Sequence, residues 1–323
     1  MRFNPSRWGR RITAAAALVT LAFATSAEAA EYEVPWTAQA AFQAQSQDPG
    51  SPPAGANDFD CEPTQRRPDP VVLVHGLSAN QTVNWTTVSP FLANRGFCIF
   101  SLTYGTKDNV TTPVYQPGGL VKMQRSARQL KRFVGEVRAA TGASRVDIVG
   151  HSQGSLMPNY YVRFLGGAKR VDDYVGVTPL WDGTNLAGLA TLDAIGQALG
   201  FETIAYHTLR PFCASCKQFL SSSRFMRKMN SGGGPAEPGV DYTMIMTRND
   251  ELVVPWQSGY MNGATNHVVQ EQCALDQSEH LSIIYDPITA YDILNALSRP
   301  ADAAEVPCVP VLPLVGAAGY SGD

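Results

Sequence analysis

The sequence predicts an α/β fold in which a mostly parallel sheet is covered by helices on both faces. Apolar runs of strand length alternate along the chain with segments of helical length. The strand-like runs are almost continuously apolar, which is typical of parallel strands that are buried on both faces. One of these runs, 146–149, leads directly into Gly150-His151-Ser152-Gln153-Gly154, and a segment of helical length follows it. These observations together define the expected architecture.

Length, composition and charge limit the number of domains and the classes of partner that the sequence allows. The chain has 323 residues, of which 44% are hydrophobic and 16% charged, with a formal net charge of -3. This length allows one large domain or two small ones. The charge is too small and too evenly spread to indicate a nucleic-acid partner or a strongly charged substrate. The glycine run 232–234 lacks the lysine of a phosphate-binding loop, and we expect neither a cofactor nor a metal.

Residues 1–29 have the features of a secretory signal peptide. Four arginines precede an apolar run, 12–24, and the small-x-small exit Ala27-Glu28-Ala29 follows. The apolar run is too short to span a membrane comfortably. We therefore expect the mature protein to be secreted to the extracellular space, and Arg10-Arg11 leaves the twin-arginine route open beside the general one.

Export changes the interpretation of the six cysteines, because disulfides are the default for an even set in an oxidising compartment. Sequence alone cannot choose among the possible connectivities, but closeness in the chain favours Cys61–Cys98, Cys213–Cys216 and Cys273–Cys308. Cys213-Ala214-Ser215-Cys216 also has the spacing of a redox motif or of half a zinc site. No second ligand pair or thioredoxin-like unit accompanies it, so we interpret it as a small structural loop.

The chain before the first buried strand has no clear periodicity. Residues 30–69 are rich in Ala, Gln, Ser, Pro and Gly, and we expect them to form an extended arm over the domain. The apolar run 70–74 then ends in His75-Gly76-Leu77, which is typical of a buried strand that delivers a loop at its carboxyl end. Residues 82–95 have the length of one helix, and 98–104 have the pattern of the next strand.

The clearest helix is predicted over residues 120–140. Its apolar side chains form one stripe at steps of four, three, four and three: Met123, Ala127, Leu130, Val134 and Val137. Its basic side chains lie on the other faces, and we interpret them as solvated rather than as a site for an acidic partner. Thr141-Gly142 ends this helix, and the strand at 146–149 begins almost at once.

A second half of the sheet is expected after the glycine–serine turn. Residues 174–179 and 241–247 have the pattern of strands, and 267–270 that of a last strand. A long insertion, 180–238, separates the first two of these. Residues 288–297 are predicted to close the domain 70–298 as a helix, and the Pro-, Ala- and Gly-rich segment 299–323 to form a loose tail.

Ser152 is the predicted nucleophile. Gly-x-Ser-x-Gly between a strand and a helix is the pattern of a sharp turn that holds a serine hydroxyl at its crest. Glycine is needed at Gly150 and Gly154 because any side chain there would collide with neighbouring backbone. The pattern also occurs by chance in loops, but here a strand and a helix flank it. We interpret His151 as a packing or supporting residue, since it cannot place its ring opposite the hydroxyl of its neighbour.

A serine hydroxyl is a weak nucleophile at neutral pH, so it needs a base within hydrogen-bond reach and a group that orients this base. In this kind of turn the acid precedes the histidine in the chain. Three histidines follow Ser152. His207 lies within the insertion and His267 at a strand edge, whereas His280 lies in a loop between the last strand and the closing helix. We therefore predict His280 as the base.

The predicted acid is Asp250. It comes directly after the strand 241–247, at the edge of the sheet where site residues of open α/β folds collect. Glu251 is the second choice, and we interpret Asp276 as a loop residue.

Acyl transfer also requires donors for the oxygen that becomes negative in the tetrahedral intermediate. The backbone N–H of Gln153, directly after the nucleophile, is one predicted donor. The backbone N–H of Leu77 is the other, because Gly76 allows its loop to approach closely. We expect His75 to brace this loop rather than to transfer protons.

These motifs together resemble those of secreted bacterial lipases of the class 2 lipase family, which have the α/β-hydrolase fold. The resemblance rests on His75-Gly76, the turn around Ser152, Asp250 in its loop, and Glu279-His280 before an apolar run. It covers about residues 70–297, and the long insertion and the six cysteines depart from the smallest members. It implies a triad of Ser152, Asp250 and His280 that hydrolyses acyl ester lipids. We also expect transient contact with a lipid–water interface and a monomeric enzyme.

Other functions fit the same residues. A polyester hydrolase of the cutinase type or an acyltransferase would use the same triad, and the motifs do not show whether water or another hydroxyl intercepts the acyl-enzyme. A non-catalytic binding protein on the same fold is a third possibility. The presence of all three triad residues in order argues against it, because a binding protein has no use for them.

The insertion carries one apolar stripe at steps of three, three, three and four: Leu186, Leu189, Leu192, Ile195 and Leu199. Such a stripe usually marks a face buried in the core. It can also line an acyl site and face a lipid surface, where exposed apolar area gains by burial. The resemblance favours the second interpretation, in which Leu189 and Leu192 bind substrate.

Overall fold

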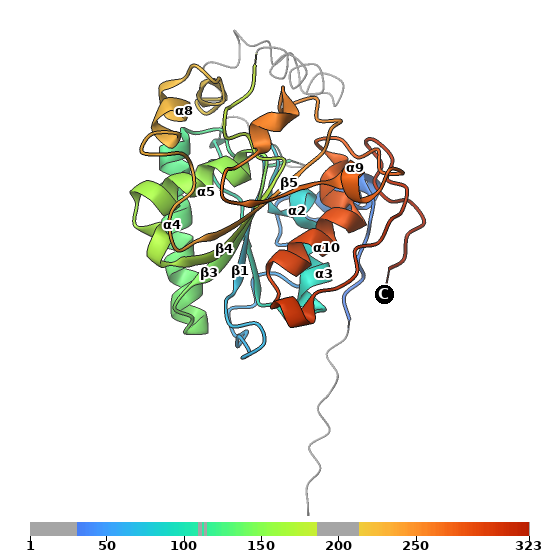
Figure 1. The fold of residues 1–323 in the computed structure, drawn as a ribbon. Helices are drawn as coiled ribbons and strands as arrows, with labels where there is room; N and C mark the ends of the chain where they lie inside the picture. Colours follow the sequence, from blue (N-terminus) through green and yellow to red (C-terminus); the bar gives the residue numbers. More distant parts are fainter. Residues whose placement is uncertain (1–30, 109–111, 113–114, 186–212, 323) are drawn as a thin grey trace, which may run out of the picture. The chain divides into compact units, whose positions relative to one another are not determined.

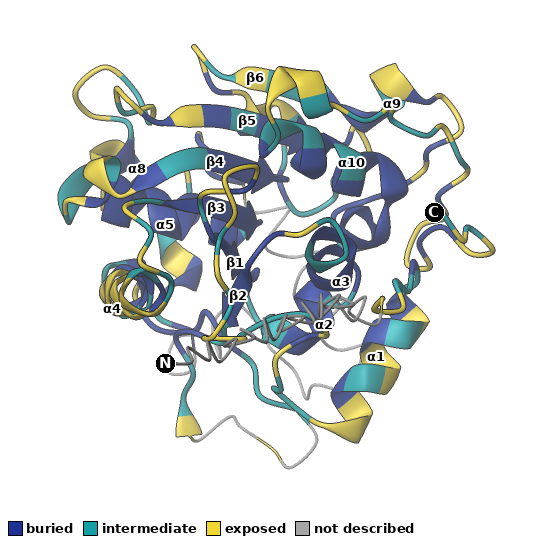
Figure 2. Cartoon of the chain, turned by 90° about the horizontal axis from the view of Figure 1, so that it is seen from below, coloured by how far each residue is buried: buried dark blue, intermediate teal, exposed yellow. Residues whose placement is uncertain are grey.

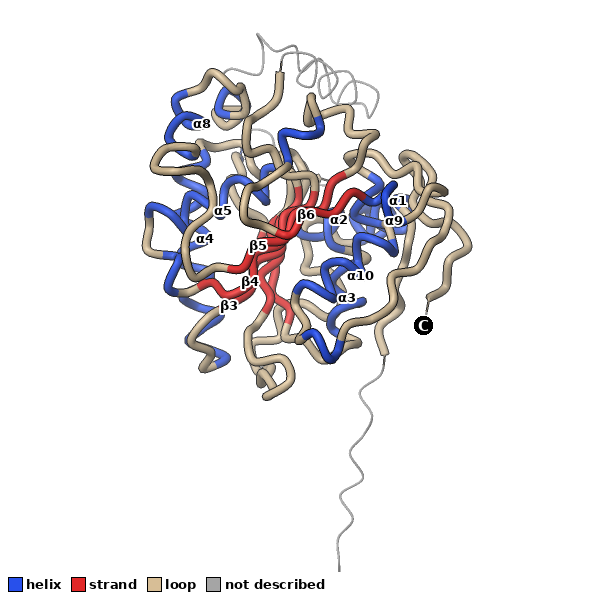
Figure 3. Tube along the Cα trace, viewed as in Figure 1, coloured by secondary structure: helices blue, strands red, loops and turns tan. Residues whose placement is uncertain are grey.

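A parallel sheet forms the centre of the fold, with strand order β2-β1-β3-β4-β5-β6 (Figure 1, Figure 3). The computed structural model describes residues 31–108, 112, 115–185 and 213–322, and the helices and strands among them belong to the unit Tyr32–Asp323. The strands are β1 (Val71–Val74), β2 (Ile99–Leu102), β3 (Val146–His151), β4 (Val171–Val177), β5 (Asp241–Met246) and β6 (Thr265–Val268). Every neighbouring pair is parallel, which confirms the predicted sheet.

Helices cover both faces of the sheet, as Figure 2 shows. One face packs against α4 (Met123–Thr141), α5 (Gln153–Phe164) and α8 (Arg224–Met229), and the other against α2 (Gln81–Trp85), α3 (Val88–Ala93) and α10 (Pro287–Ala296). Strand β1 serves both cores, because successive side chains of a strand point to opposite faces. Val72 and Val74 belong to the first core, and Val71 and Leu73 to the second. This two-sided burial explains the continuous apolar runs.

Shorter elements complete the chain. They are α1 (Ala38–Gln47), α9 (Val269–Gln272) and the 3-10 turns η2 (Gly167–Lys169), η3 (Cys216–Gln218), η4 (Trp256–Gly259), η5 (Ser282–Tyr285) and η6 (Pro300–Asp302).

The predicted stripe on α4 is buried along its whole length, from Met123 to Val137. The helix begins three residues after the predicted start and ends at Thr141. Gly142 follows with φ 71°, and its N–H donates to the Arg138 carbonyl at 3.0 Å. This left-handed residue ends the helix as the sequence indicates.

The expected extended arm contains a helix instead. In α1, Thr37 is the N-cap, and its side chain accepts a hydrogen bond from the Ala40 N–H. The helix is rich in Ala and Gln, which favour helix formation, but only Ala38, Ala41 and Gln45 are buried. A helix that buries so little apolar surface has no periodic apolar pattern, and the composition of the segment did not indicate it.

The single helix expected over 82–95 is divided in two. α2 ends at Trp85 and α3 begins at Val88, with Thr86 and Thr87 between them. Both segments remain buried against the second core. The break lies one turn before Pro90, which has no N–H to donate to the Thr86 carbonyl and whose ring would clash with that carbonyl in a continuous helix.

The prediction of a loose C-terminal tail is wrong. Val311 and Ala317 are fully or almost fully buried, and the Ala317 N–H donates to the Trp36 carbonyl at 2.9 Å. The Gln277 N–H donates to the Val311 carbonyl at 3.0 Å, so the tail pairs with the loop that leads to His280. Apolar side chains in a Pro- and Gly-rich stretch thus find partners far away in the sequence.

Three disulfides join Cys61 to Cys98, Cys213 to Cys216 and Cys273 to Cys308, the pairing that closeness in the chain favours. The last of these joins the tail to Cys273, the residue that follows α9. The predicted signal peptide, 1–29, lies outside the described residues, as do His207, Leu189 and Leu192 in the insertion. Among the residues that the structure describes, no helix is both long enough and apolar enough to cross a membrane.

Candidate active site

Ser152 stands at the tight turn between β3 and α5. Its φ is 55° and its ψ -120°, a backbone conformation that non-glycine residues rarely adopt and that is held here by the surrounding fold. A Cβ added at Gly150 would lie 1.9 Å from the Gly154 carbonyl oxygen, and one at Gly154 would lie 1.9 Å from the Val74 carbonyl oxygen. Both glycines are therefore required for the turn, as the sequence pattern indicates.

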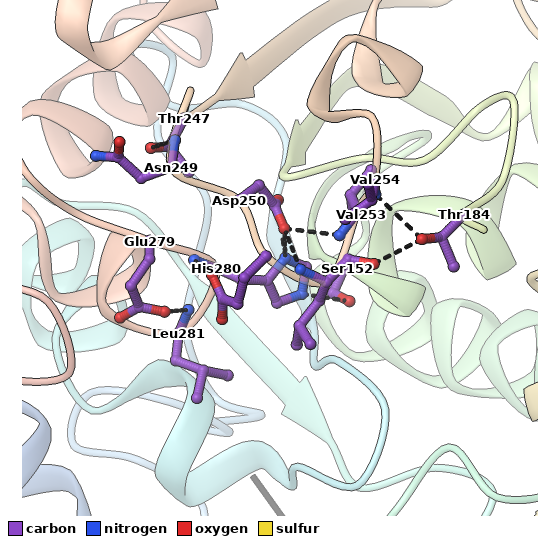
Figure 4. A network of polar contacts seen from close by, with 12 residues as sticks. Ser152, Thr184, Thr247, Asn249, Asp250, Val253, Val254, Glu279, His280 and Leu281 are labelled. Carbon is purple, nitrogen blue, oxygen red and sulfur yellow. Dashed lines mark hydrogen bonds and ion pairs between the residues drawn. The ribbon is translucent and has the colours of Figure 1, made fainter. Parts of the chain in front are cut away.

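The structure brings Ser152, His280 and Asp250 into one hydrogen-bonded chain (Figure 4). His280 Nε2 lies 2.8 Å from Ser152 Oγ, and His280 Nδ1 lies 2.9 Å from each carboxylate oxygen of Asp250. The side chains of His280 and Asp250 are each only 3% exposed. This is the geometry of a nucleophile, a base and a group that orients the base.

Asp250 is itself held in place by its own loop. Its Oδ1 accepts hydrogen bonds from the N–H groups of Leu252 at 3.0 Å and Val253 at 2.7 Å. Thr184 Oγ1 donates to the Leu252 carbonyl at 2.7 Å and accepts from the Val254 N–H at 3.1 Å (Figure 4). The first residues of the insertion thus fix the loop that carries the acid.

Two glutamates stabilise the backbone around His280. Glu251, the second choice for the acid, accepts a hydrogen bond from the His280 backbone N–H at 3.3 Å. Glu279 accepts from the N–H groups of Leu281 at 2.7 Å and Ser282 at 2.9 Å. It also accepts from the Leu314 N–H at 2.9 Å, which links the C-terminal tail to the loop that carries His280.

These carboxylates set the protonation of the site. Burial alone favours the neutral ring of His280. The charge of Asp250, its hydrogen bond, and the charges of Glu251 and Glu279 outweigh burial and raise the pKa of His280 above its ordinary value. Burial also raises the pKa of Glu251 to about 7, although the neighbouring His280 acts in the opposite direction. The site is therefore prepared to stabilise an imidazolium.

The ring of His151 contacts the backbone of the loop that carries His280. Its Nε2 lies 2.9 Å from the His280 carbonyl oxygen, and its Nδ1 lies 3.0 Å from Asn84 Oδ1. Burial and the neighbouring His280 lower the pKa of His151 well below its ordinary value, so the ring is neutral and donates to one of these two oxygens. Asn84 Oδ1 also accepts from the Gly76 N–H at 3.0 Å. No sequence motif marks Asn84, which lies in the helix α2.

His75 is fixed as the tautomer with a proton on Nδ1. Its Nδ1–H donates to the Gly76 carbonyl at 2.7 Å, and its Nε2 accepts from the Tyr104 N–H at 3.2 Å. Burial lowers the pKa of His75 to about 4, so the ring stays neutral. The Gly76 carbonyl and the Leu77 N–H belong to one trans peptide plane and point in opposite directions. By holding the carbonyl, His75 fixes the direction of the Leu77 N–H.

The loop before Leu77 approaches the nucleophile closely. A Cβ added at Gly76 would lie 3.3 Å from Ser152 Cβ and 3.2 Å from His151 Nδ1. Gln153, the first residue of α5, is fully buried, and its side-chain Nε2 donates to the Gly119 carbonyl at 2.9 Å. The backbone N–H groups of Leu77 and Gln153 thus belong to two chain segments that meet beside Ser152.

The remaining sequence candidates lie elsewhere. His267 is in β6, and Asp276 is in a turn where its Oδ1 accepts from the N–H and the hydroxyl of Ser278 at 2.8 and 2.6 Å. Within the described part of the chain, no group of three or more His, Cys, Asp or Glu side chains could hold a metal ion.

Two curated relatives are triacylglycerol lipases, from Pseudarthrobacter phenanthrenivorans and Burkholderia plantarii, and each is 34% identical to this chain over 98 residues. That stretch is 28% of this chain and 27% and 24% of these relatives, so the match spans about a quarter of their length.

Solved structures of lipases share the fold. Aspergillus fumigatus lipase B superposes with a TM-score of 0.55 at 18% identity, over 79% of this chain and 56% of that one. The mature form of Bacillus licheniformis lipase BlEst2 superposes with a TM-score of 0.54 at 16% identity, over 77% of this chain and 97% of that one. Identities this low establish the α/β-hydrolase fold and nothing finer.

A family model provides the wider match. The model described as lipase (class 2) matches residues 68–290, which include β1, the turn around Ser152, Asp250 and His280. The match covers more than half of the 323 residues. The chain therefore belongs to the class 2 lipase family.

Proposed function

We propose that this protein is a serine carboxylester hydrolase, a triacylglycerol lipase or esterase that acts through an acyl-enzyme on Ser152. The hydrogen-bonded chain from Asp250 through His280 to Ser152 Oγ, with contacts of 2.9 and 2.8 Å, carries this proposal. Family membership supports it, since the matched model is that of a lipase family.

The reaction follows from the contacts. Ser152 Oγ attacks the ester carbonyl carbon while His280 Nε2 takes its proton, and Asp250 stabilises the resulting imidazolium. The backbone N–H groups of Leu77 and Gln153 donate to the oxygen that becomes negative. His280 then protonates the leaving alkoxide, and the acyl group remains on Ser152. Water attacks this acyl-enzyme with His280 again as the base, and the fatty acid leaves.

The substrate class rests on the relatives. The two curated relatives are named triacylglycerol lipases, so we infer an acyl ester lipid as the substrate. A cutinase-like polyester hydrolase or an acyltransferase would use the same three side chains and remains the alternative.

We further propose that the enzyme is secreted, works as a monomer and touches lipid–water interfaces transiently. The basic and apolar pattern of residues 1–29 and the three disulfides support export.

Turnover of paired substrates tests the function. Purified enzyme should hydrolyse soluble short-chain esters and emulsified long-chain triacylglycerols, with release of fatty acid measured for each. Transfer of the acyl group to an added alcohol in preference to water would favour the acyltransferase. Hydrolysis of polyester film without hydrolysis of triacylglycerol would favour the cutinase-like alternative.

The pH profile should show the raised pKa of His280. A general base must be neutral, and below its pKa His280 is protonated, so kcat/KM should fall as the pH decreases. Because the nearby carboxylates raise the pKa of His280, the midpoint of this acidic limb should lie above 6.5, its ordinary value. Measurement of kcat/KM on a soluble ester from pH 4.5 to 9 checks this, and a midpoint below the ordinary value would contradict the assigned electrostatics.

The insertion provides a separate prediction. Leu189 and Leu192 lie outside the described residues, and we propose that they line the acyl site. Leu189→Asp or Leu192→Asp should then leave the melting temperature nearly unchanged and reduce activity on emulsified long-chain esters more than on soluble short ones. If the stripe is core, either change should lower the melting temperature by many degrees or unfold the protein. Thermal melts beside the two assays separate these results.

A further inference from the structure

The loop closed by the Cys213–Cys216 disulfide packs directly on the segment 118–120. Ser215 Oγ donates to the Gly119 carbonyl at 2.6 Å, and the Ala214 N–H donates to the Leu120 carbonyl at 2.7 Å. Cys213, Cys216 and Leu120 form a small buried cluster, and the side chain of Leu77 packs against it. The disulfide loop therefore contacts both segment 118–120 and the residue proposed as an oxyanion donor.

Segment 118–120 is joined to the loop that carries Leu77. The Ser78 N–H donates to the Gly118 carbonyl at 3.0 Å, and the Gly118 N–H donates to the Ala79 carbonyl at 2.8 Å. A Cβ added at Gly119, where φ is +74°, would lie 3.3 Å from Leu77 Cα and 2.9 Å from Gln153 Nε2. Gly119 thus lies between the two residues whose backbone N–H groups are proposed to hold the oxyanion.

The Gly119 carbonyl is the point where these contacts converge. It accepts from Ser215 Oγ at 2.6 Å and from Gln153 Nε2 at 2.9 Å, which uses both of its lone pairs. One donor comes from the disulfide loop and the other from the residue after the nucleophile. This carbonyl would remain hydrogen-bonded without Ser215, so the need to satisfy a buried polar group does not by itself account for the serine.

Local contacts also hold Ser215 in place. It is fully buried, and its Oγ lies 3.3 Å from Cys213 Sγ. The Cys216 N–H donates to Cys213 Sγ at 3.1 Å. The disulfide spans a sequence separation of only 3, and so short a closed loop removes little conformational entropy from the unfolded chain. Its main effect is to fix the shape of the loop that presents Ser215.

We propose that Ser215, presented by the Cys213–Cys216 loop, is a positioning residue of the oxyanion hole. Its hydroxyl fixes the Gly119 peptide, and the Gly119 segment fixes the Leu77 N–H relative to Ser152. Ser215 does not touch the reacting atoms and acts through Gly119. This inference rests on the proposed ester hydrolysis, since an oxyanion hole has meaning only for that chemistry.

The test compares Ser215→Ala with Ser215→Thr, which keeps the hydroxyl. With a soluble short-chain ester, Ser215→Ala should lower kcat by roughly 10- to 100-fold, the cost of a small misplacement at a site, with little change in KM. Ser215→Thr should recover most of this loss. Ser231→Ala is the matched control, because Ser231 is exposed and its hydroxyl donates only to the Lys228 carbonyl at 2.8 Å.

A transition-state analogue separates positioning from general stability. An alkyl boronic acid forms a tetrahedral adduct with a serine nucleophile and so depends on the oxyanion donors. Its affinity should fall in Ser215→Ala by about the same factor as kcat, whereas the affinity of the product fatty acid should not change. A lower melting temperature with unchanged kcat and unchanged boronic acid affinity would overturn the proposal and leave Ser215 as a structural residue.

Hydrogen exchange gives a result that does not depend on turnover. Backbone exchange in the peptide containing Leu77 should be faster in Ser215→Ala, and in a Cys213→Ala, Cys216→Ala double variant, than in the unchanged protein. Unchanged exchange in both variants would overturn the connection from Ser215 to Leu77. Faster exchange in a protein that hydrolyses no ester would support the connection and contradict the proposed function instead.

Discussion

Ser152→Ala is expected to abolish ester hydrolysis and to leave the fold intact. The change removes the one oxygen that His280 Nε2 contacts at 2.8 Å, and it removes little packing volume. Without a nucleophile no acyl-enzyme can form, and loss of a triad member costs about four to six orders of magnitude in kcat. Release of fatty acid from short- and long-chain esters, measured beside a thermal melt, checks both halves of this prediction.

Ser298→Ala is the matched control. Ser298 lies after α10, and its hydroxyl donates to the Leu294 carbonyl at 2.6 Å, away from Ser152. Ser298→Ala should retain turnover within about twofold, because it removes one local hydrogen bond and touches no part of the triad. Undiminished hydrolysis by Ser152→Ala would refute the assignment of the nucleophile.

Asp250→Asn is expected to have the second largest effect. Both carboxylate oxygens lie 2.9 Å from His280 Nδ1, so the carboxylate keeps the proton on that nitrogen and leaves Nε2 free to act as base. An amide in its place allows the wrong tautomer, and kcat should fall by about four orders of magnitude with little change in KM. Steady-state kinetics on a soluble ester measure this directly.

Glu251→Gln is the natural companion variant. The glutamate accepts a hydrogen bond from the His280 backbone N–H at 3.3 Å, and the amide oxygen of a glutamine can still accept that hydrogen bond. We therefore expect a loss of less than about tenfold, since only a supporting charge is removed. The opposite ranking of the two variants would make Glu251 the acid and would require a different arrangement of the loop.

An element can be predicted from the sequence where the pattern of its own residues identifies it. The apolar runs predict the inner parallel strands, because a strand buried on both faces must be largely apolar. The edge strand β6 (Thr265–Val268) is polar and only Val268 is buried, so the strand predicted over 267–270 is misplaced and its second half belongs to α9. The glycines around Ser152 mark the turn, because neither position has room for a Cβ. Chain order then selected Asp250 and His280, which the fold places 2.9 Å apart although 30 residues separate them.

Long-range contacts could not be predicted in the same way. Helix α1 and the C-terminal tail bury few side chains each, so neither gives a periodic pattern. Asn84 contacts both Gly76 and His151 from a segment without a motif. Ser215 contacts Gly119 from within the Cys213–Cys216 pair, whose spacing does not indicate this contact. Such supporting residues depend on how distant segments meet, which the sequence does not display.

The central claim is that Ser152 forms a covalent intermediate, and a mechanism-based label tests it most directly. A p-nitrophenyl alkylphosphonate should transfer its phosphonyl group to Ser152 Oγ with release of p-nitrophenol, because His280 activates this oxygen. Mass spectrometry of the digested protein should find one phosphonyl group per chain, on the peptide that contains Ser152, and none in Ser152→Ala. A protein that takes up no label, or takes it up equally in Ser152→Ala, would contradict the account.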